Sequence, residues 1–343
     1  MFPIMAINIS DIKKAGKILA NVNSSLDDIL MAELLIGEWR KHHYYPILTI
    51  QATLRNHVKR MSDEQSVVVQ RLKKMQTIKE KLKRYPTMRL HTMQDIGGCR
   101  AIFSDCCFVY ELQSRLKASS MRHKIVNEKN YIHTPKESGY RGIHLIFEYN
   151  SLRNSSYNGL KIEIQIRTNL QHLWATAVET VGTFTNYSLK SSIGPDVWLL
   201  FFKLMSSLIA LEENCNPVPN MPNNRNDIIN MLNELNSTHS ILEKLSTIDA
   251  TCDFIKNRQI NTRKFYVIVI KEQGKDIGVA DYTKLEEANS HYIEAEKDAQ
   301  NNAVLVSATS LDALRKAYPN YFMNISGFLE LTHKLMKGET HEI

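Results

Sequence analysis

Two acidic residues stand in settings that suit metal or proton chemistry, and Asp95 is the first. It precedes Gly97 and Gly98, which open a short apolar run over 97–103. Adjacent glycines let the backbone approach another group closely, and a carboxylate there could bind Mg²⁺, which prefers carboxylate and phosphate oxygens. An Asp at such a place also serves as a helix N-cap or a turn residue, and the motif alone leaves both interpretations open.

Glu163 is the second, within the segment LKIEIQI over 160–166. Isoleucines alternate with polar residues here, so a strand would place the isoleucines on one face and the polar side chains on the other. The two sets are Ile162, Ile164 and Ile166, and Lys161, Glu163 and Gln165. Burying a carboxylate is costly unless it is paired. Glu163 is therefore a metal ligand or general base, or it faces water on a half-exposed strand.

A strongly basic run covers residues 71–89, with eight basic residues and one acidic residue. Apolar residues recur in and before it at helical spacing, which predicts a helix over 64–84 that ends before Pro86. The face opposite the apolar one would present a row of Lys and Arg. Such a row suits polyphosphate, nucleic acid or an acidic partner, although solvated helix faces carry similar charge.

A fourth cluster, YIHTPKESGYRGIH, spans 131–144. A turn at Pro135 and Gly139 followed by an exposed Tyr could form a stacking platform for a base, and Arg and His can reach phosphates. The cluster contains Lys136, Tyr140, Arg141 and His144. Alone, this pattern also fits an ordinary hairpin.

Taken in order, the four segments resemble the synthetase domain of RelA/SpoT-type alarmone synthetases. The similar motifs are RLKKMQTIKEKL, DIGGCR, NYIHTPKESGYRGIH and EIQIRTNLQHLWATAVE, and the resemblance covers about residues 65–190. It implies a mixed β-sheet, nucleotidyltransferase-like domain flanked by helices. The fold class expected is therefore α+β (α/β), with a small C-terminal α/β module.

The resemblance also implies a role for each matching residue. Asp95 and Glu163 would be the catalytic residues and the ligands of Mg²⁺, and Glu163 would activate the acceptor 3′-hydroxyl. Tyr140 and Arg141 would bind the acceptor, with Tyr140 stacked on its base. ATP would be bound by Arg71, Lys73, Lys81, Arg100, Lys129, Lys136, His144 and Gln165.

The implied activity is an ATP:GTP or GDP 3′-pyrophosphotransferase that makes (p)ppGpp and releases AMP. Ser138 replaces the family's usual Asn, which leaves the acceptor open. One alternative is a toxin-like synthetase that pyrophosphorylates the 3′ end of tRNA, and another is an inactive nucleotide-binding regulator. No His-Asp dipeptide is present, so we expect a short, synthetase-only member.

The elements that must position these residues can be predicted from periodicity. We expect helices over 10–60, with Ser10 as an N-cap and a turn at Pro46. Strands are expected over 97–103, 122–129, 143–149 and 160–166, and helices over 106–119, 169–182 and 195–213. After a linker at 216–224, NPVPNMPNN, we expect a helix over 225–257, strands at 265–270, 276–280 and 303–308, and helices at 283–299 and 311–335.

These elements suggest an N-terminal helical region over 1–62, a synthetase domain over 63–215, the linker, and a C-terminal module over 225–343 that regulates or supports the core. The chain has 343 residues and a formal charge of +7, with 43% hydrophobic and 23% charged residues, which excludes disordered, collagen-like and coiled-coil classes. A homo-oligomer is possible.

The cysteines predict the compartment. Five Cys in 343 residues, with no CxxC pair, indicate reduced thiols and argue against a thiolate zinc site. The first residues lack the pattern of a signal peptide, and the most apolar stretch, 197–211, is too short for a membrane span. We therefore expect a cytoplasmic protein with no membrane partner.

Overall fold

The computed structural model describes residues 8–21, 23–85, 87–185, 189, 192–256, 265–271, 276–298, 302–307 and 325–340. The fold is α+β, as the sequence predicts, and is built on a mixed sheet in the order β3-β4-β5-β2-β1-β8-β6-β7. Among the described strands, β2 and β5 pair in parallel and every other neighbouring pair is antiparallel.

Five strands come from the segment that resembles the synthetases. They are β1 (Val67–Leu72), β2 (Gly97–Phe103), β3 (Lys124–Asn130), β4 (Ile143–Glu148) and β5 (Lys161–Thr168). The helices that connect and follow them are α4 (Met75–Arg84), α5 (Cys106–Lys117), α6 (Asn169–Thr185) and α7 (Asp196–Glu212). The predictions for β2 to β5 and for α5 to α7 are confirmed within a few residues.

The expected helix over 64–84 is wrong in its first half, which is strand β1. Three consecutive valines, Val67–Val69, favour an extended chain because β-branched side chains pack well on a pleated surface. This strand pairs with β2 along its length. Arg71 therefore lies on a strand and Lys73 just after it, whereas Lys81 lies on α4.

The N-terminal region forms three helices, α1 (Ile9–Ala20), α2 (Leu26–His42) and α3 (Tyr44–Val58). Asn8, not Ser10, caps α1, because its side-chain oxygen accepts the Ser10 amide at 2.9 Å. Pro46 does not mark a turn. It lies in the first turn of α3, where a missing amide hydrogen costs no helical hydrogen bond.

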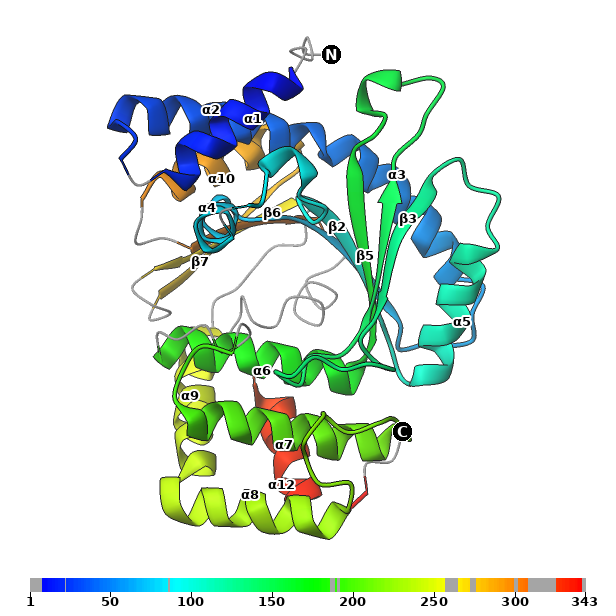
Figure 1. Ribbon diagram of the computed structural model, residues 1–343, viewed down its shortest axis with the longest axis vertical. Helices are drawn as coiled ribbons and strands as arrows, with labels where there is room; N and C mark the ends of the chain where they lie inside the picture. Colours follow the sequence, from blue (N-terminus) through cyan, green and yellow to red (C-terminus); the bar gives the residue numbers. More distant parts are fainter. Residues whose placement is uncertain are drawn as a thin grey trace.

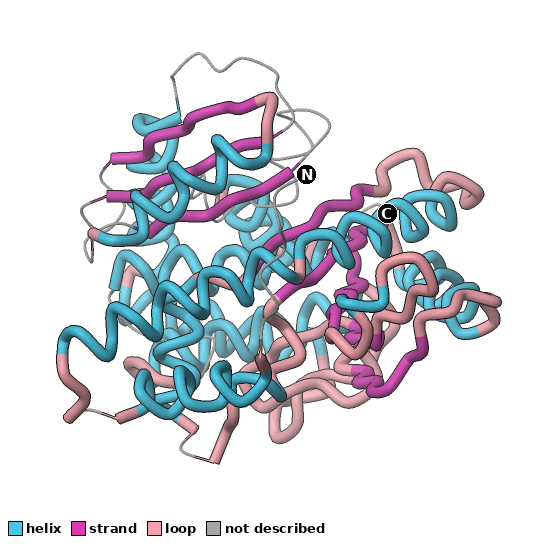
Figure 2. The backbone as a smooth tube through the Cα atoms, turned by 90° about the horizontal axis from the view of Figure 1, so that it is seen from above, coloured by secondary structure: helices cyan, strands magenta, loops and turns pink. Residues whose placement is uncertain are grey.

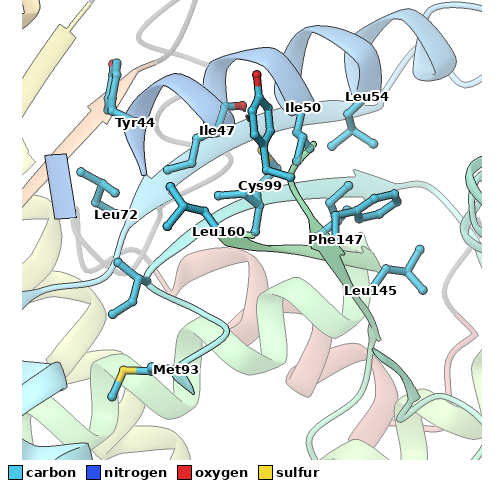
Figure 3. Packing of buried hydrophobic residues seen from close by; sticks show 14 of the residues in the cluster. Tyr44, Ile47, Ile50, Leu54, Leu72, Met93, Cys99, Leu145, Phe147 and Leu160 are labelled. Carbon is cyan, nitrogen blue, oxygen red and sulfur yellow. Dashed lines mark hydrogen bonds between the residues drawn. The ribbon is translucent and has the colours of Figure 1, made fainter. Parts of the chain in front are cut away.

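Helix α3 packs on the outer face of the bent sheet, and the main hydrophobic core lies between them (Figure 1). Ile47, Ile50 and Leu54 point from α3 toward Cys99, Leu145 and Phe147 of the sheet (Figure 3). Burial of these apolar residues means that β2, β4 and β5 turn their apolar face toward α3. The opposite face must then carry the polar residues of the same strands.

The helices after the predicted linker pack against helices of the preceding segment. Helices α8 (Arg225–His239) and α9 (Ile241–Lys256) replace the single helix expected there, and the break is Ser240, whose φ is +50°. They pack with α6, α7 and α12 (Ser326–Met336) around a second core, on the side of the sheet opposite α3 (Figure 1). Of the helices expected over 311–335, the part over 311–324 lies outside the described residues, and α12 is the rest.

Three further strands extend the sheet, namely β6 (Phe265–Lys271), β7 (Asp276–Tyr282) and β8 (Asn302–Ser307). Strand β8 pairs with β1, through Gln70 and Arg71, and α10 (Leu285–Lys297) lies over the three strands (Figure 2). Whether residues 225–343 act as a separate module stays a prediction, but in the structure their strands continue the sheet that β1 to β5 form.

The helix expected over 195–213 is confirmed as α7, which is buried among its neighbours. In the described part of the chain, no helix combines the length and the apolarity that crossing a membrane requires.

We predict that Phe328→Ala lowers the free energy of unfolding by about 3–5 kcal/mol, as expected for a buried Phe. Phe328 of α12 is fully buried, with ring centroids 6.4 Å from Phe201 and 5.9 Å from Phe202. Denaturant unfolding measures the change. Leu152→Ala is the control, because Leu152 is 75% exposed and should change stability by less than about 0.5 kcal/mol. Equal stability of the Phe328 variant and wild type would show that α12 does not share this core.

Candidate active site

The parallel pairing of β2 with β5 aligns the two acidic motifs. Gly98 lies opposite Glu163, and Arg100 lies opposite Gln165. A Cβ at Gly98 would lie 2.9 Å from the Glu163 carbonyl oxygen, and one at Gly97 would lie 2.6 Å from Ile47 Cδ1. The close backbone approach expected from these glycines is therefore confirmed, and no larger residue fits either position without a shift.

One pocket is lined by polar side chains from the face of the sheet opposite α3. The alternation along β5 is as predicted, because its three isoleucines are buried in the core under α3 and Glu163 and Gln165 line the pocket. The lining residues are Arg71, Asp95, Gly98, Cys99, Arg100, Glu163 and Gln165. Five predicted site residues, from β1, β2, β5 and the loop before β2, thus meet at one place.

Asp95 is held by two lysines. Lys73 Nζ donates to Asp95 Oδ2 at 2.8 Å, and Lys81 Nζ donates to Oδ1 and Oδ2 at 3.1 and 3.0 Å. Burial alone would raise the pKa of Asp95, but the two lysines outweigh it and lower the pKa to about 2. Asp95 is therefore ionised at neutral pH, and it is not a helix N-cap.

Lys73 is the more deeply placed of the two lysines. It is 7% exposed, and burial lowers its pKa even though Asp95 opposes the shift. The sequence predicts a row of cations on one helix, whereas the structure brings Lys73 from the end of β1 and Lys81 from α4 to the same carboxylate. Two ammonium groups from different elements therefore meet at one carboxylate that lines the pocket.

Glu163 is fixed by two hydrogen bonds. His144 Nδ1 donates to Oε1 at 2.8 Å, and Gln165 Nε2 donates to Oε2 at 2.8 Å. Burial would raise the pKa of Glu163, but these donors, His144 above all, lower it below its ordinary value. The carboxylate is thus ionised and oriented, which is the state that a general base or a cation ligand requires.

Tyr140 completes a chain of hydrogen bonds to Glu163. Its hydroxyl lies 2.7 Å from His144 Nε2, and a neutral His144 that donates through Nδ1 accepts this hydrogen through Nε2. The expectation of an exposed tyrosine is wrong, since Tyr140 is 5% exposed and packs edge-on to Tyr131. Lys136 Nζ lies over both rings, 4.5 Å from the centroid of Tyr131 and 5.2 Å from that of Tyr140.

Arg141 does not reach the pocket, contrary to the expectation that it binds the acceptor. It is 2% exposed, and its guanidinium donates to Ser206 Oγ, the Ile132 carbonyl and the Asn216 carbonyl at 3.2, 3.3 and 2.6 Å. These bonds tie the loop before β4 to α7 and to the segment that follows α7. The side chain is used in packing because its loop folds against α7.

Lys129 is placed differently again. It lies exposed on β3, where it pairs across the ladder with His144. His144 in turn binds Glu163 of the pocket. The contact of Lys129 with ATP stays a prediction.

Arg167 is a residue that the sequence analysis missed. It follows Glu163 and Gln165 at the same two-residue period, so alternation could have placed it on the pocket face. It is 3% exposed, its Nε has no hydrogen-bond partner, and burial lowers its pKa to about 9. Arg100 and Tyr140 are among the groups whose charge acts on it. A buried cation held this way is costly by itself and suits an anionic ligand.

Comparison with known proteins shows which family the chain resembles over this region. A family model described as the region found in RelA/SpoT proteins matches residues 70–186. GTP pyrophosphokinase YjbM of Bacillus subtilis is 31% identical over 155 residues, which cover 44% of this chain and 70% of YjbM. The chain belongs to the RelA/SpoT family.

Two further proteins are similar to this chain. GTP pyrophosphokinase YwaC of Bacillus subtilis is 39% identical over 84 residues, which are 24% of this chain and 40% of YwaC. The crystal structure of small alarmone synthetase 1 from Bacillus subtilis bound to its product pppGpp covers 52% of this chain and 93% of its own, at 24% identity and a TM-score of 0.44.

We predict that Arg167→Met raises the free energy of unfolding by about 1–4 kcal/mol, the range seen when apolar side chains replace buried charges. The same change should weaken binding of ATP, used as an anionic probe, by at least tenfold. Melting curves and titration calorimetry give the two quantities.

Arg141→Met is the matched control, since Arg141 is equally buried but has three acceptors. It should lose stability, by about 1–3 kcal/mol for each acceptor left unpaired. If Arg167→Met instead unfolded more easily and bound ATP like wild type, Arg167 would be a packing residue.

Proposed function

We propose that this protein transfers pyrophosphate from ATP to the 3′-hydroxyl of GTP or GDP, which gives (p)ppGpp and AMP. The observation that supports it most is the pocket, which Asp95 and Glu163 line together with Arg71 and Arg100, while Lys73 and Lys81 bind Asp95. Membership of the RelA/SpoT family and the relatives named GTP pyrophosphokinase point the same way.

The reaction forms one bond and breaks one bond. The acceptor 3′-oxygen bonds to the β-phosphorus of ATP while the bond from that phosphorus to the bridging oxygen of the α-phosphate breaks, and AMP leaves. The hydroxyl proton passes to Glu163, whose oriented and ionised carboxylate can accept it. Because charge spreads over the phosphate oxygens, positioning and cations supply most of the catalysis.

The cations of the pocket would bind the donor. Lys73 and Lys81 now pair with Asp95, and phosphate oxygens would share or replace that carboxylate as their partner. Arg71, Arg100 and Arg167 come from adjacent strands on the same face, and Arg can bind phosphate through two parallel hydrogen bonds. Lys136, Lys129 and His144 would extend the cationic surface toward the acceptor.

Mg²⁺ fits the donor atoms of this site. Asp95 and Glu163 offer carboxylate oxygens in one pocket, and the charge of Asp95 acts on Glu163 in the direction of repulsion, which a cation would relieve. Both residues would hold the ion. Bound there, Mg²⁺ would neutralise charge on the phosphates of ATP.

The acceptor is the less determined substrate. Tyr140 would stack on its base only after the ring is uncovered, because Tyr131 and Lys136 now cover it. We propose a guanosine nucleotide, on the names of the relatives.

Incubation of the pure protein with γ-labelled ATP and GTP, GDP or deacylated tRNA tests which acceptor is used. Label in a guanosine product supports the proposal, label in tRNA identifies the alternative acceptor, and no transfer to any of them supports the inactive regulator.

We predict that Asp95→Asn and Glu163→Gln each reduce AMP release by at least a hundredfold, because each substitution removes one of the two charges that the transfer needs. Both changes nearly conserve shape. Asp95→Asn should also cost some stability, since it leaves the buried Lys73 without its counterion.

Glu148→Gln is the control for these variants. Glu148 lies at the end of β4, pairs with Lys161 and is outside the pocket, so its activity should stay within about twofold of wild type. Turnover at the wild-type rate in either pocket variant would refute the roles given to Asp95 and Glu163.

We predict that Tyr140→Ala raises the KM for the acceptor roughly 5–150-fold, as the loss of one stacked base would, and changes the KM for ATP little. Tyr140→Phe is the matched variant, because it keeps the ring and removes only the hydrogen bond to His144. It should keep the acceptor KM within about threefold. Equal losses of donor and acceptor affinity in Tyr140→Ala, or a Phe variant as impaired as the Ala variant, would contradict stacking.

A further inference from the structure

A second group of ligand-type side chains lies away from the pocket, where the start of α5 meets the segment after α7. Cys106 is the first residue of α5, and Glu213 and Cys215 directly follow α7. One ligand atom from each lies within 4.8 Å of the other two. None of these residues lines the pocket described above.

The spacing of the sulfurs suits a shared metal ion. Cys106 Sγ and Cys215 Sγ are 3.9 Å apart. Two thiolates on a tetrahedral zinc ion, each at about 2.3 Å from the metal, lie about 3.8 Å from each other. The two cysteines therefore already stand at the separation that such an ion needs.

The carboxylate is oriented by neighbours as metal-binding carboxylates are. Thr168 Oγ1 donates to Glu213 Oε1, and Gln171 Nε2 donates to Oε2 at 2.7 Å. Gln171 Nε2 also lies 3.7 Å from Cys106 Sγ. Such outer hydrogen bonds fix ligand geometry in known metal sites, and here they come from the end of β5 and the start of α6.

The charges balance with a divalent ion. Two thiolates and one carboxylate carry three negative charges, and the ion and Arg141 together carry three positive ones. Arg141 is next to the group, since its Nη2 donates at 2.6 Å to the carbonyl of Asn216, the residue after Cys215. The charge of Arg141 also interacts with Cys215, Glu213 and Cys106.

We propose that Cys106, Glu213 and Cys215 bind a zinc-class divalent ion, with water at the fourth position. Thiolates select zinc over the Mg²⁺ assigned to the pocket, because Mg²⁺ prefers oxygen ligands. The ion would link the N-terminus of α5 to the segment after α7 and so stabilise the contact between them. The absence of a CxxC pair argued against a thiolate zinc site, but these two cysteines are 109 positions apart and the fold brings them together.

The test uses the full chain, reduced and freed of metal, titrated with Co²⁺ as a spectroscopic probe. We expect one Co²⁺ per chain, with the visible bands of tetrahedral coordination and a thiolate charge-transfer band, displaced by one equivalent of Zn²⁺. Zn²⁺ should also raise Tm by several degrees. Absence of these bands in the reduced wild-type protein would overturn the proposal.

Variants assign the ligands. Cys106→Ser, Cys215→Ser and Glu213→Gln should each weaken Co²⁺ binding at least tenfold, whereas Cys107→Ser, which changes the exposed neighbouring thiol, should bind like wild type. Thiol labelling and intact mass of the untreated protein separate the other use of a close cysteine pair. A Cys106–Cys215 disulfide that forms in air while the reduced protein takes up no Co²⁺ would assign the pair to redox chemistry and refute the metal site.

Discussion

The parallel pairing of β2 with β5 is the constraint on which the candidate site depends. It places Gly98 against the backbone of Glu163 and Arg100 beside Gln165. The loop before β2 then carries Asp95 to the same pocket. A shift of one residue in this register would turn Glu163 toward the apolar core under α3 and break the site. The packing of α3 on the isoleucines of β5 therefore protects the chemistry on the opposite face.

The same face holds charges that a stable core would avoid. Lys73, Asp95, Glu163 and Arg167 are all largely buried, and their pKa values show how far burial acts on each. Asp95 and Glu163 stay ionised because specific donors outweigh burial. Arg167 has no such partner at Nε. A buried guanidinium with an unused donor is suited to a ligand that brings its own negative charge.

The sequence predicted the parts of the site that local pattern controls. Alternation placed Glu163 and Gln165 on the polar face of a strand, and the two glycines indicated close backbone contact. It failed at β1, because the helical pattern of the basic run was extended back over three valines, Val67–Val69, that pair with β2 as a strand. It also failed for Arg141 and Tyr140, because their burial comes from contacts with α7 and with Tyr131 that no local pattern records. Pairing of β8 with β1 and the approach of Cys106 to Cys215 are likewise contacts between distant segments.

We expect the polar face of β1, β2 and β5 to bind the phosphates of ATP between Asp95 and Glu163. A crystal structure with a non-hydrolysable ATP analogue and Mg²⁺ is the decisive measurement. It should show triphosphate density in contact with Lys73 and Lys81, and a cation bound by Asp95 and Glu163. A triphosphate bound elsewhere, with the Lys73–Asp95 and Lys81–Asp95 pairs unchanged, would contradict this expectation.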